Sequence, residues 1–272
     1  METAINIILF TMLVTTALMV VRLRSLFAVV MLSGVFSLLS ALLLVTLDAV
    51  DVAFTEAAVG AGISTVLLLG KTEANLSQVY DEVEAAGHPQ PVVIPFNLET
   101  ALPHQYDELA AMIEREFGKL DGLLHNASII GPRTPLEQLS GDNFMRVMQV
   151  NVNATFMLTS TLLPLLKLAP DASVVFTSSS VGRKGRAYWG AYAVSKFATE
   201  GLMQVLADEL DGIASVRANS VNPGATRTDM RAQAYPGENP ASNPAPEAIM
   251  PVYLYLMGPD SNGVNGQAFD AQ

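Results

Sequence analysis

Cysteine is absent from the 272 residues, and histidine occurs only three times. The absence of thiols excludes a disulfide framework, a thiolate metal site and cysteine nucleophile chemistry. His88, His104 and His125 show no metal-ligand spacing, so the sequence predicts no metal site. Basic residues are also scarce, with 15 Lys plus Arg against 26 Asp plus Glu and a net charge of −11. This balance, without any basic run, argues against a nucleic-acid partner.

Charge is scarcest in residues 1–70, which contain only six charged side chains. Three apolar runs occur there, and each approaches the length of about 20 residues that crosses a bilayer. The runs are 4–21, 26–47 and 52–69, and the third contains one charge, Glu56. We therefore predict about three transmembrane-type helices at the start of the chain.

The charges between these runs predict their orientation. Arg22 and Arg24 lie in the first connection, so the positive-inside rule places that connection, and everything after residue 70, in the cytoplasm. A signal peptide is the alternative for the first run, but its start has Glu2 instead of a basic residue and no cleavage site follows. We expect membrane association through residues 4–69 with the remainder facing the cytoplasm, or a cytoplasmic chain if this segment is not inserted.

The Arg-x-Arg after the first run and the segment DVAFTEAAVGAG at 51–62 resemble a known membrane domain. It is the small hydrophobic domain of A/B-type proteins of multisubunit sodium/proton antiporters and of the D-type component of membrane-bound hydrogenases. The resemblance covers about the first quarter of the chain and implies that Glu56 is a proton-relay candidate. The alternative is that Glu56 lies near the interface and contacts lipid headgroups.

From residue 65 onward, short apolar runs alternate with helical patterns, which is typical of βαβ units and a parallel α/β sheet. Thr72 is the expected N-cap of the first helix. The expected strands are 65–69, 91–95, 122–124, 173–177 and 216–221, and the expected helices are 73–86, 105–117, 140–166, 191–210 and 246–257.

Tyr192 and Lys196 form the sharpest chemical signal, because side chains four residues apart on a helix share one face. An ammonium beside a phenol favours the phenolate, so we expect a lowered pKa for Tyr192. A lowered pKa would make Tyr192 a usable general acid or base. Taken alone, the spacing also fits a solvated helix face.

Other polar residues follow the ends of the expected strands, where ligands bind in this architecture. Ser179 follows strand 173–177, and Asn151 lies inside the long helix 140–166. The remaining clusters are Asn126-Ala127-Ser128 after strand 122–124 and Asn222-Pro223-Gly224 after strand 216–221.

In this order, these motifs resemble the short-chain dehydrogenase/reductase family over residues 65–272. The segments SSSVGRKGRAYWGAYAVSKFATEGL and NGQAFDAQ are similar to its YciK-type members. The resemblance implies a Rossmann-like, doubly wound parallel sheet and an enzyme that moves a hydride between a nicotinamide and a small-molecule carbonyl or alcohol. It also implies a homo-oligomer formed through the long helices, and it divides the chain into 1–64 and 65–272.

The family roles carry over residue by residue. Tyr192 would transfer the proton, Ser179 would hold the substrate oxygen, and Lys196 would bind the nicotinamide ribose. Asn151 would hold a relay water through a local kink in its helix. Together with Tyr192 and Lys196, the implied cofactor contacts are Lys71, Asn97, Leu98, Asn126, Ala127, Ser128, Pro223, Gly224, Thr226 and Thr228.

Lys71 and Asn97 bear on the choice of cofactor. Lys71 stands where the family often places a basic residue for the 2′-phosphate, which favours NADP over NAD. The alternative is an exposed lysine at a helix start. Asn97 stands where the family usually has Asp against the adenine, and its amide can still form a hydrogen bond.

The family's opening strand and glycine-rich turn, Thr-Gly-x3-Gly-x-Gly, have no counterpart in the sequence. Gly60 and Gly62 lie too close to strand 65–69 for the helix of a βαβ unit, which needs roughly 10–12 residues. Because the first strand is central in the 3-2-1-4-5-6 order, we expect a truncated sheet and weak or no nicotinamide-dependent activity. The segment 65–69 is also assigned twice, as a membrane run and as a strand, which indicates a fusion of two proteins.

Two alternatives to an active oxidoreductase remain open at this point. One is a membrane subunit of a cation/proton antiporter complex that carries an inactive dehydrogenase-like passenger. The other is a hybrid that misfolds at the junction and exposes sheet edges. The substrate is not readable, since residues 229–248 are expected to form a lid that sets specificity.

Overall fold

The computed structural model describes residues 11, 15 and 65–272 of the chain. Apart from residues 11 and 15, the predicted membrane runs 4–21 and 26–47 lie outside the described residues, and so does Glu56. Two compact units make up the chain, a first unit at Met1–Pro95 and a second unit at Phe96–Gln272.

The described part of the first unit is a single βαβ element. Strand β1 (Leu67–Gly70) pairs in parallel with β2 (Val92–Pro95), and helix α4 (Glu73–Ala85) connects them. Thr72 is the N-cap residue, as predicted, but its side chain makes no capping hydrogen bond. Its carbonyl oxygen instead accepts the amides of Asn75 and Leu76 at 3.1 and 3.2 Å.

The structure corrects the predicted membrane association. Residues 67–69 were expected to end the third membrane run, and they form strand β1 instead. Their backbone pairs with β2, whereas a membrane helix satisfies its backbone groups internally. Among residues 65–272, no helix is both long and apolar enough to cross a membrane. This finding overturns the predicted localisation at a membrane with the dehydrogenase part facing the cytoplasm.

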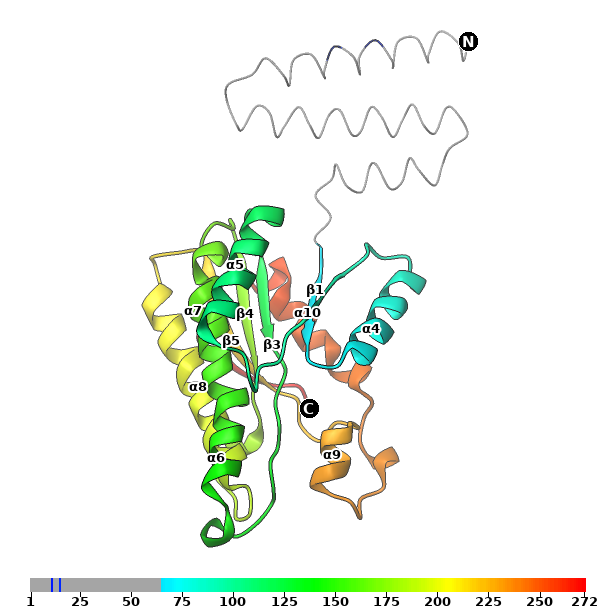
Figure 1. Cartoon of the computed structure of the whole chain (residues 1–272), viewed down its shortest axis with the longest axis vertical. Helices are drawn as coiled ribbons and strands as arrows, with labels where there is room; N and C mark the ends of the chain where they lie inside the picture. Colours follow the sequence, from blue (N-terminus) through cyan, green and yellow to red (C-terminus); the bar gives the residue numbers. More distant parts are fainter. Residues whose placement is uncertain (1–10, 12–14, 16–64) are drawn as a thin grey trace. The chain divides into compact units, whose positions relative to one another are not determined.

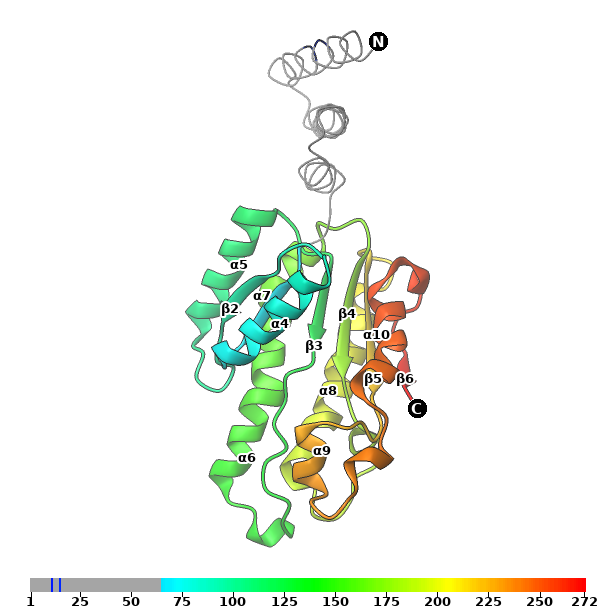
Figure 2. The same ribbon diagram turned by 90° about the vertical axis from the view of Figure 1, so that its right-hand side faces the viewer.

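Four parallel strands form the sheet of the second unit, in the order β3-β4-β5-β6 (Figure 2). They are β3 (Gly122–His125), β4 (Ala172–Thr177), β5 (Val216–Asn222) and β6 (Ala268–Asp270). The described strands therefore fall into two sheets, β1-β2 and β3-β4-β5-β6. A 3-2-1-4-5-6 order without its first strand divides in the same way.

Helices cover both faces of this sheet. Helices α7 (Ala154–Leu166) and α8 (Gly190–Leu210) lie on one face, and α10 (Met250–Met257) lies on the other (Figure 1). Alternate residues of a strand point to opposite faces, so Phe176 packs with the first two helices and Val175 packs with α10. Helix α5 (Pro103–Phe117) packs against α7.

The predicted helix 140–166 is interrupted. It consists of α6 (Gly141–Met148), a π-helical turn at Gln149–Asn153, and α7. A π turn accommodates an extra residue in the helix and bends the backbone there. Asn151 is the central residue of this turn, so the helix is irregular at the position where the sequence predicted a kink.

Short elements complete the second unit, and one of them, the 3-10 turn Pro246–Ile249, replaces the first turn of the predicted helix 246–257. Helix α9 (Asp229–Ala234) lies beyond the carboxyl ends of β3, β4 and β5 (Figure 2), within the predicted lid at 229–248. Its first turn is capped by Thr228, whose hydroxyl accepts the amide of Arg231 at 3.2 Å. The 3-10 turns are Leu136–Gln138, Ser180–Gly182, Pro240–Ser242, Pro246–Ile249 and Pro259–Ser261.

Candidate active site

Strand β4 and the start of α8 bring Ser179 and Tyr192 together. Ser179 follows the carboxyl end of β4 and is the N-cap of the turn Ser180–Gly182. Its hydroxyl accepts the amide of Val181 at 3.4 Å and also forms a hydrogen bond with the Tyr192 side chain. The hydroxyl group and the phenol therefore converge although 13 positions separate them in the sequence.

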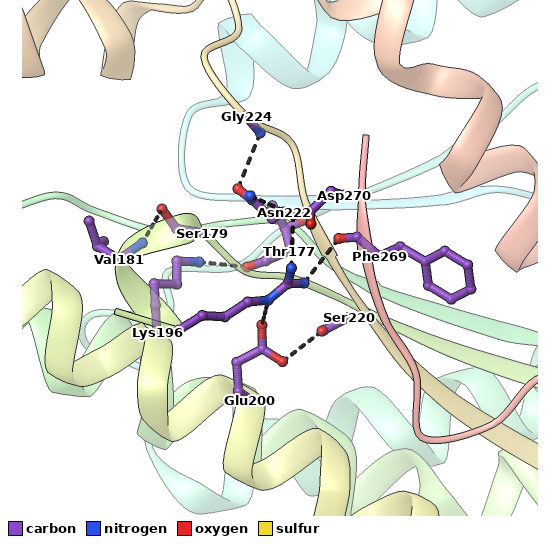
Figure 3. A network of polar contacts seen from close by, with 11 residues as sticks. Thr177, Ser179, Val181, Lys196, Glu200, Ser220, Asn222, Gly224, Phe269 and Asp270 are labelled. Carbon is purple, nitrogen blue, oxygen red and sulfur yellow. Dashed lines mark hydrogen bonds and ion pairs between the residues drawn. The ribbon is translucent and has the colours of Figure 1, made fainter. Parts of the chain in front are cut away.

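Lys196 is buried beside this pair. Its Nζ donates a hydrogen bond to the Thr177 carbonyl oxygen at 2.7 Å and lies 5.6 Å from the centre of the Tyr192 ring. One turn of α8 separates Tyr192 from Lys196, as the sequence spacing predicts. Lys196 and Ser179 thus lie at one end of β4 (Figure 3), and the Tyr192 phenol lies beside them.

The expected lowering of the Tyr192 pKa is wrong. Burial raises the pKa of Tyr192 to about 12, the hydrogen bond from Ser179 opposes the rise, and Tyr253 adds to it. Removal of the phenol from water disfavours the phenolate more than its polar neighbours favour it. In the described state the phenol therefore keeps its proton at neutral pH.

Burial also shifts the pKa values of two neighbouring bases. Burial lowers the pKa of Lys196 to about 8, and Glu200 opposes that change. The pKa of His125 falls to about 3 through burial, with a further contribution from the charge of Lys196. His125 is therefore neutral, with Nε2 2.9 Å from the Thr159 hydroxyl and its ring stacked on Phe176.

Asn151 joins the loop after β3 to helix α8. Its side-chain oxygen accepts the Ile129 amide at 2.8 Å, and its amide nitrogen donates to the Ile129 carbonyl at 2.9 Å and to the Ser195 hydroxyl at 3.0 Å. Ser195 in turn donates to the carbonyl of Tyr192 at 2.8 Å. Asn151 therefore holds the turn of α8 that carries Tyr192, and its role toward a relay water stays a prediction.

The predicted cofactor contacts occur in several places. Asn126 accepts the Thr177 hydroxyl at 3.1 Å, and Ser128 lines a cavity of about 540 Å³, with Ala127 between them. Asn97 accepts the amide of Glu99 at 3.1 Å, and the Leu98 carbonyl accepts the Gln149 amide at 3.4 Å. Lys71 lies in the first unit, exposed at the bend after β1.

The loop after β5 holds the other predicted cofactor residues. Gly224 adopts a left-handed φ of 72°, and its amide donates to the Asn222 side chain at 3.2 Å. Thr226 donates to the Pro223 carbonyl at 3.0 Å, and Thr228 donates to the Thr226 carbonyl at 3.4 Å. This loop is therefore ordered by its own short hydrogen bonds.

Comparison with known proteins decides the family. A family model described as short chain dehydrogenase matches residues 51–239. The chain belongs to the short-chain dehydrogenase family. It is 50% identical over 222 residues to the oxidoreductase YciK of Escherichia coli (strain K12), across 82% of this chain and 86% of that protein. The predicted oxidoreductase class and the Rossmann-like α/β fold are thereby confirmed.

Solved structures of the family agree. A short chain dehydrogenase from Pseudomonas syringae is 74% identical with a TM-score of 0.75, across 76% of this chain and 84% of that one. A Shigella flexneri short chain dehydrogenase, complexed with NADP, is 48% identical with a TM-score of 0.75, across 81% of this chain and 92% of that one. An Escherichia coli CFT073 relative, complexed with NADPH, is 51% identical with a TM-score of 0.74, across 76% of this chain and 86% of that one.

A second family model, MbhD, which describes the D component of MBH, matches residues 11–71. This match confirms the predicted resemblance of the first quarter of the chain. The two family matches overlap at 51–71, and β1 lies in the overlap. The alternative function within an antiporter complex stays a prediction.

Sequence reasoning missed several residues of the dehydrogenase site. Tyr253 of α10 places its hydroxyl 3.2 Å from that of Thr177, and the Gln272 amide donates to the Pro223 carbonyl at 2.7 Å. No local spacing signals either contact. Glu200 was also missed, although its position four residues after Lys196 on the same helix was a readable signal.

A cation–aromatic stack joins the lid to α8. The guanidinium of Arg133 lies 4.6 Å from the Trp189 ring and 4.7 Å from the Tyr235 ring. Trp189 lies 5.7 Å from the ring of Tyr192, and Arg231 of α9 lies 3.9 Å from Tyr235. Residues of the predicted lid therefore connect through Trp189 to the Tyr192 ring.

Gly182 is required where the turn after Ser179 meets α8. A Cβ at this position would lie 2.8 Å from the Lys196 Cβ and 2.9 Å from its carbonyl atoms, closer than packing allows. We expect Gly182→Ala to lower the free energy of unfolding by about 1–3 kcal/mol, because the turn must move away from Lys196. Denaturant unfolding followed by circular dichroism measures this change.

Gly185→Ala is the matched control, since a Cβ there meets nothing within 4 Å. The two alanine variants should therefore differ in stability although they lie three residues apart. Equal stabilities for both variants would contradict the close approach of Gly182 to α8.

Proposed function

We propose that this chain interconverts a small-molecule carbonyl and an alcohol with NADP(H), and that Tyr192 transfers the proton. The observation that carries the proposal is the buried Tyr192 phenol, hydrogen-bonded to Ser179 and next to the Lys196 ammonium. In the family, NADPH supplies the hydride. The residues of this chain supply the proton, the orientation and the electrostatic stabilisation.

The proton step follows from the geometry of the site. The Ser179 hydroxyl would hold the substrate oxygen while the Tyr192 phenol donates its proton to that oxygen. The Lys196 ammonium, 5.6 Å from the ring centre, would stabilise the phenolate that remains. A phenol that is protonated at neutral pH suits carbonyl reduction in this direction.

A cavity of about 540 Å³ in the second unit suits a small substrate. Residues after β3, residues of α6 and residues of α9 line it, and Ile130 belongs both to its wall and to the apolar cluster around Tyr192. The position of this cavity supports entry of the substrate between the loop after β3 and the lid at 229–248.

The donors near Tyr192 fit the nicotinamide riboside. Lys196 has three N–H groups, and the Thr177 carbonyl uses one of them. Ser178 Oγ is buried and has no hydrogen-bond partner within the described residues. The NADP and NADPH named for two of the related structures support NADP(H) here, and the exposed Lys71 suits a 2′-phosphate.

The pyrophosphate end of the cofactor does not have a matching element in the sequence. The glycine-rich turn that donates backbone N–H groups to the pyrophosphate is absent. We propose that NADP(H) binding to this chain is correspondingly weak, and that its turnover is limited by cofactor binding. The residues proposed to transfer the proton are therefore present, whereas the turn that would bind the cofactor pyrophosphate is missing.

The test is a fluorescence titration of NADPH into the full chain, beside the double variant Tyr192→Phe/Lys196→Ala. We expect weak but saturable binding, at about millimolar affinity, that becomes weaker still in the double variant. Binding that the double variant leaves unchanged would contradict the assignment of this site. Micromolar binding by the full chain would contradict the proposed impairment.

A further inference from the structure

Glu200 places a buried carboxylate one helical turn beyond Lys196 on α8. The side chain is enclosed, since the residue is only 6% exposed. Its Oε1 accepts a hydrogen bond from Arg183 Nε at 3.1 Å, and its Oε2 accepts one from the Ser220 hydroxyl at 2.7 Å (Figure 3). A buried carboxylate is costly unless it is paired and hydrogen-bonded, and both conditions are met here.

Arg183 connects Glu200 to the last strand of the sheet. Its other nitrogens donate to the Asp270 carboxylate at 2.8 Å and to the Phe269 carbonyl at 3.0 Å, both in β6 (Figure 3). Asn222 at the end of β5 donates to the same Asp270 oxygen at 2.8 Å. The network therefore joins α8, β5 and β6.

The same network restrains the segment that carries Ser179. Arg183 directly follows the turn Ser180–Gly182, and Ser179 caps that turn. The ion pair of Arg183 with Glu200 therefore ties the turn to α8, the helix that carries Tyr192 and Lys196. The Glu200 carboxylate therefore links the two segments that carry Ser179, Tyr192 and Lys196, namely the turn after Ser179 and helix α8.

We propose that Glu200 is a positioning residue of this enzyme, whose buried negative charge keeps Lys196 protonated and whose ion pair with Arg183 fixes the turn after Ser179. The proposed function enters this inference at one point only, as the reason why the enzyme needs a protonated Lys196.

The electrostatic part follows from the groups that face Lys196. These are Tyr192 on the same helix, the Thr177 carbonyl on β4, His125 on β3 and Glu200. His125 is neutral and Tyr192 is protonated near neutral pH. Glu200 thus provides the anionic charge that opposes the effect of burial on the pKa of Lys196.

Loss of that charge should therefore be measurable at Lys196. In Glu200→Gln the amide keeps the shape of the side chain and removes its charge, so the pKa of Lys196 should fall by about one unit. The measurement is an NMR titration of the full chain labelled with [ε-¹³C]lysine, without cofactor. The spectrum of Lys196→Met identifies the Lys196 signal by its absence.

Arg183→Met provides a variant with the opposite expected sign. Removal of the arginine charge leaves the Glu200 carboxylate un-neutralised, so the pKa of Lys196 should rise. Arg231→Met removes an arginine from a separate ion pair with Glu238 on the lid, and it should leave the Lys196 titration unchanged. A purely structural role for Glu200 would not produce opposite shifts in the two network variants.

The outcomes are decisive in each case. An unchanged Lys196 titration in folded Glu200→Gln, or shifts of the same sign in both network variants, would overturn the proposal. If Glu200→Gln does not fold, the absence of a rise in Arg183→Met overturns it instead. Because no cofactor is present, a failure to bind NADPH would remove the proposed function without affecting this result.

Discussion

Replacement of residues 1–64 by the opening strand, glycine-rich turn and helix of an intact family member should raise NADPH affinity by about 10²–10⁴-fold. The turn supplies backbone N–H groups and a helix N-terminus to the cofactor pyrophosphate. A hydrogen bond to a charged group contributes about 1.5–3 kcal/mol, so two such bonds give about 3–6 kcal/mol. Each 1.4 kcal/mol corresponds to about a tenfold change in affinity. Parallel fluorescence titrations of the chimera and the full chain measure the gain.

The control is a second chimera in which the glycines of the turn are replaced by valine. It keeps the added strand and helix but prevents close approach of the backbone to the pyrophosphate. We expect it to bind NADPH about as weakly as the full chain. A first chimera that binds no more tightly than the full chain would contradict the view that the missing turn limits cofactor binding.

Tyr192→Phe should lower carbonyl reduction by about 10²–10⁴-fold, measured in the glycine-containing chimera where cofactor can be saturated. The ring remains and only the proton donor is lost, so NADPH binding should change little. The measurement is NADPH oxidation against a panel of aldehydes and ketones. In the full chain, Tyr192→Phe should lower the rate by the same factor at any cofactor concentration that gives a measurable rate.

Tyr188→Phe is the matched control for the loss of a phenol hydroxyl. Tyr188 lies four residues earlier in the chain and is 55% exposed, and its left-handed φ of 70° is as accessible to Phe as to Tyr. The activity of the Tyr188→Phe chimera should equal that of the unmodified chimera. If Tyr192→Phe retains activity within about threefold, Tyr192 is not the general acid of this site.

The longer elements of the fold could be predicted from local patterns. Each expected strand from 65–69 to 216–221 overlaps an observed strand, because short apolar runs between helical periods carry a local signal. Strand β6 carried no such signal, since its three residues are set by pairing with β5. The double assignment of 65–69 was resolved by pairing with β2.

The site was predicted in outline through motif order. Ser179, Tyr192 and Lys196 converge as expected, because the carboxyl end of a parallel strand and the start of the next helix share an edge. The assignment of cofactor contacts to Lys71, Asn97 and the loop after β5 remains a prediction. The pKa of Tyr192 was predicted in the wrong direction, since burial outweighed its charged neighbour.

The sequence by itself determined the family chemistry and the absence of a glycine-rich turn, because motif order and missing residues are local facts. Only the tertiary structure decided which groups of the site are protonated and which form ion pairs. The ion pairs of Arg183 join positions 17 and 87 residues apart in the chain, and they bring Glu200 and Asp270 into one network. Burial and long-range pairing depend on the whole fold, so no local spacing could have revealed the protonated Tyr192 or the pairing of Glu200 with Arg183 and Ser220.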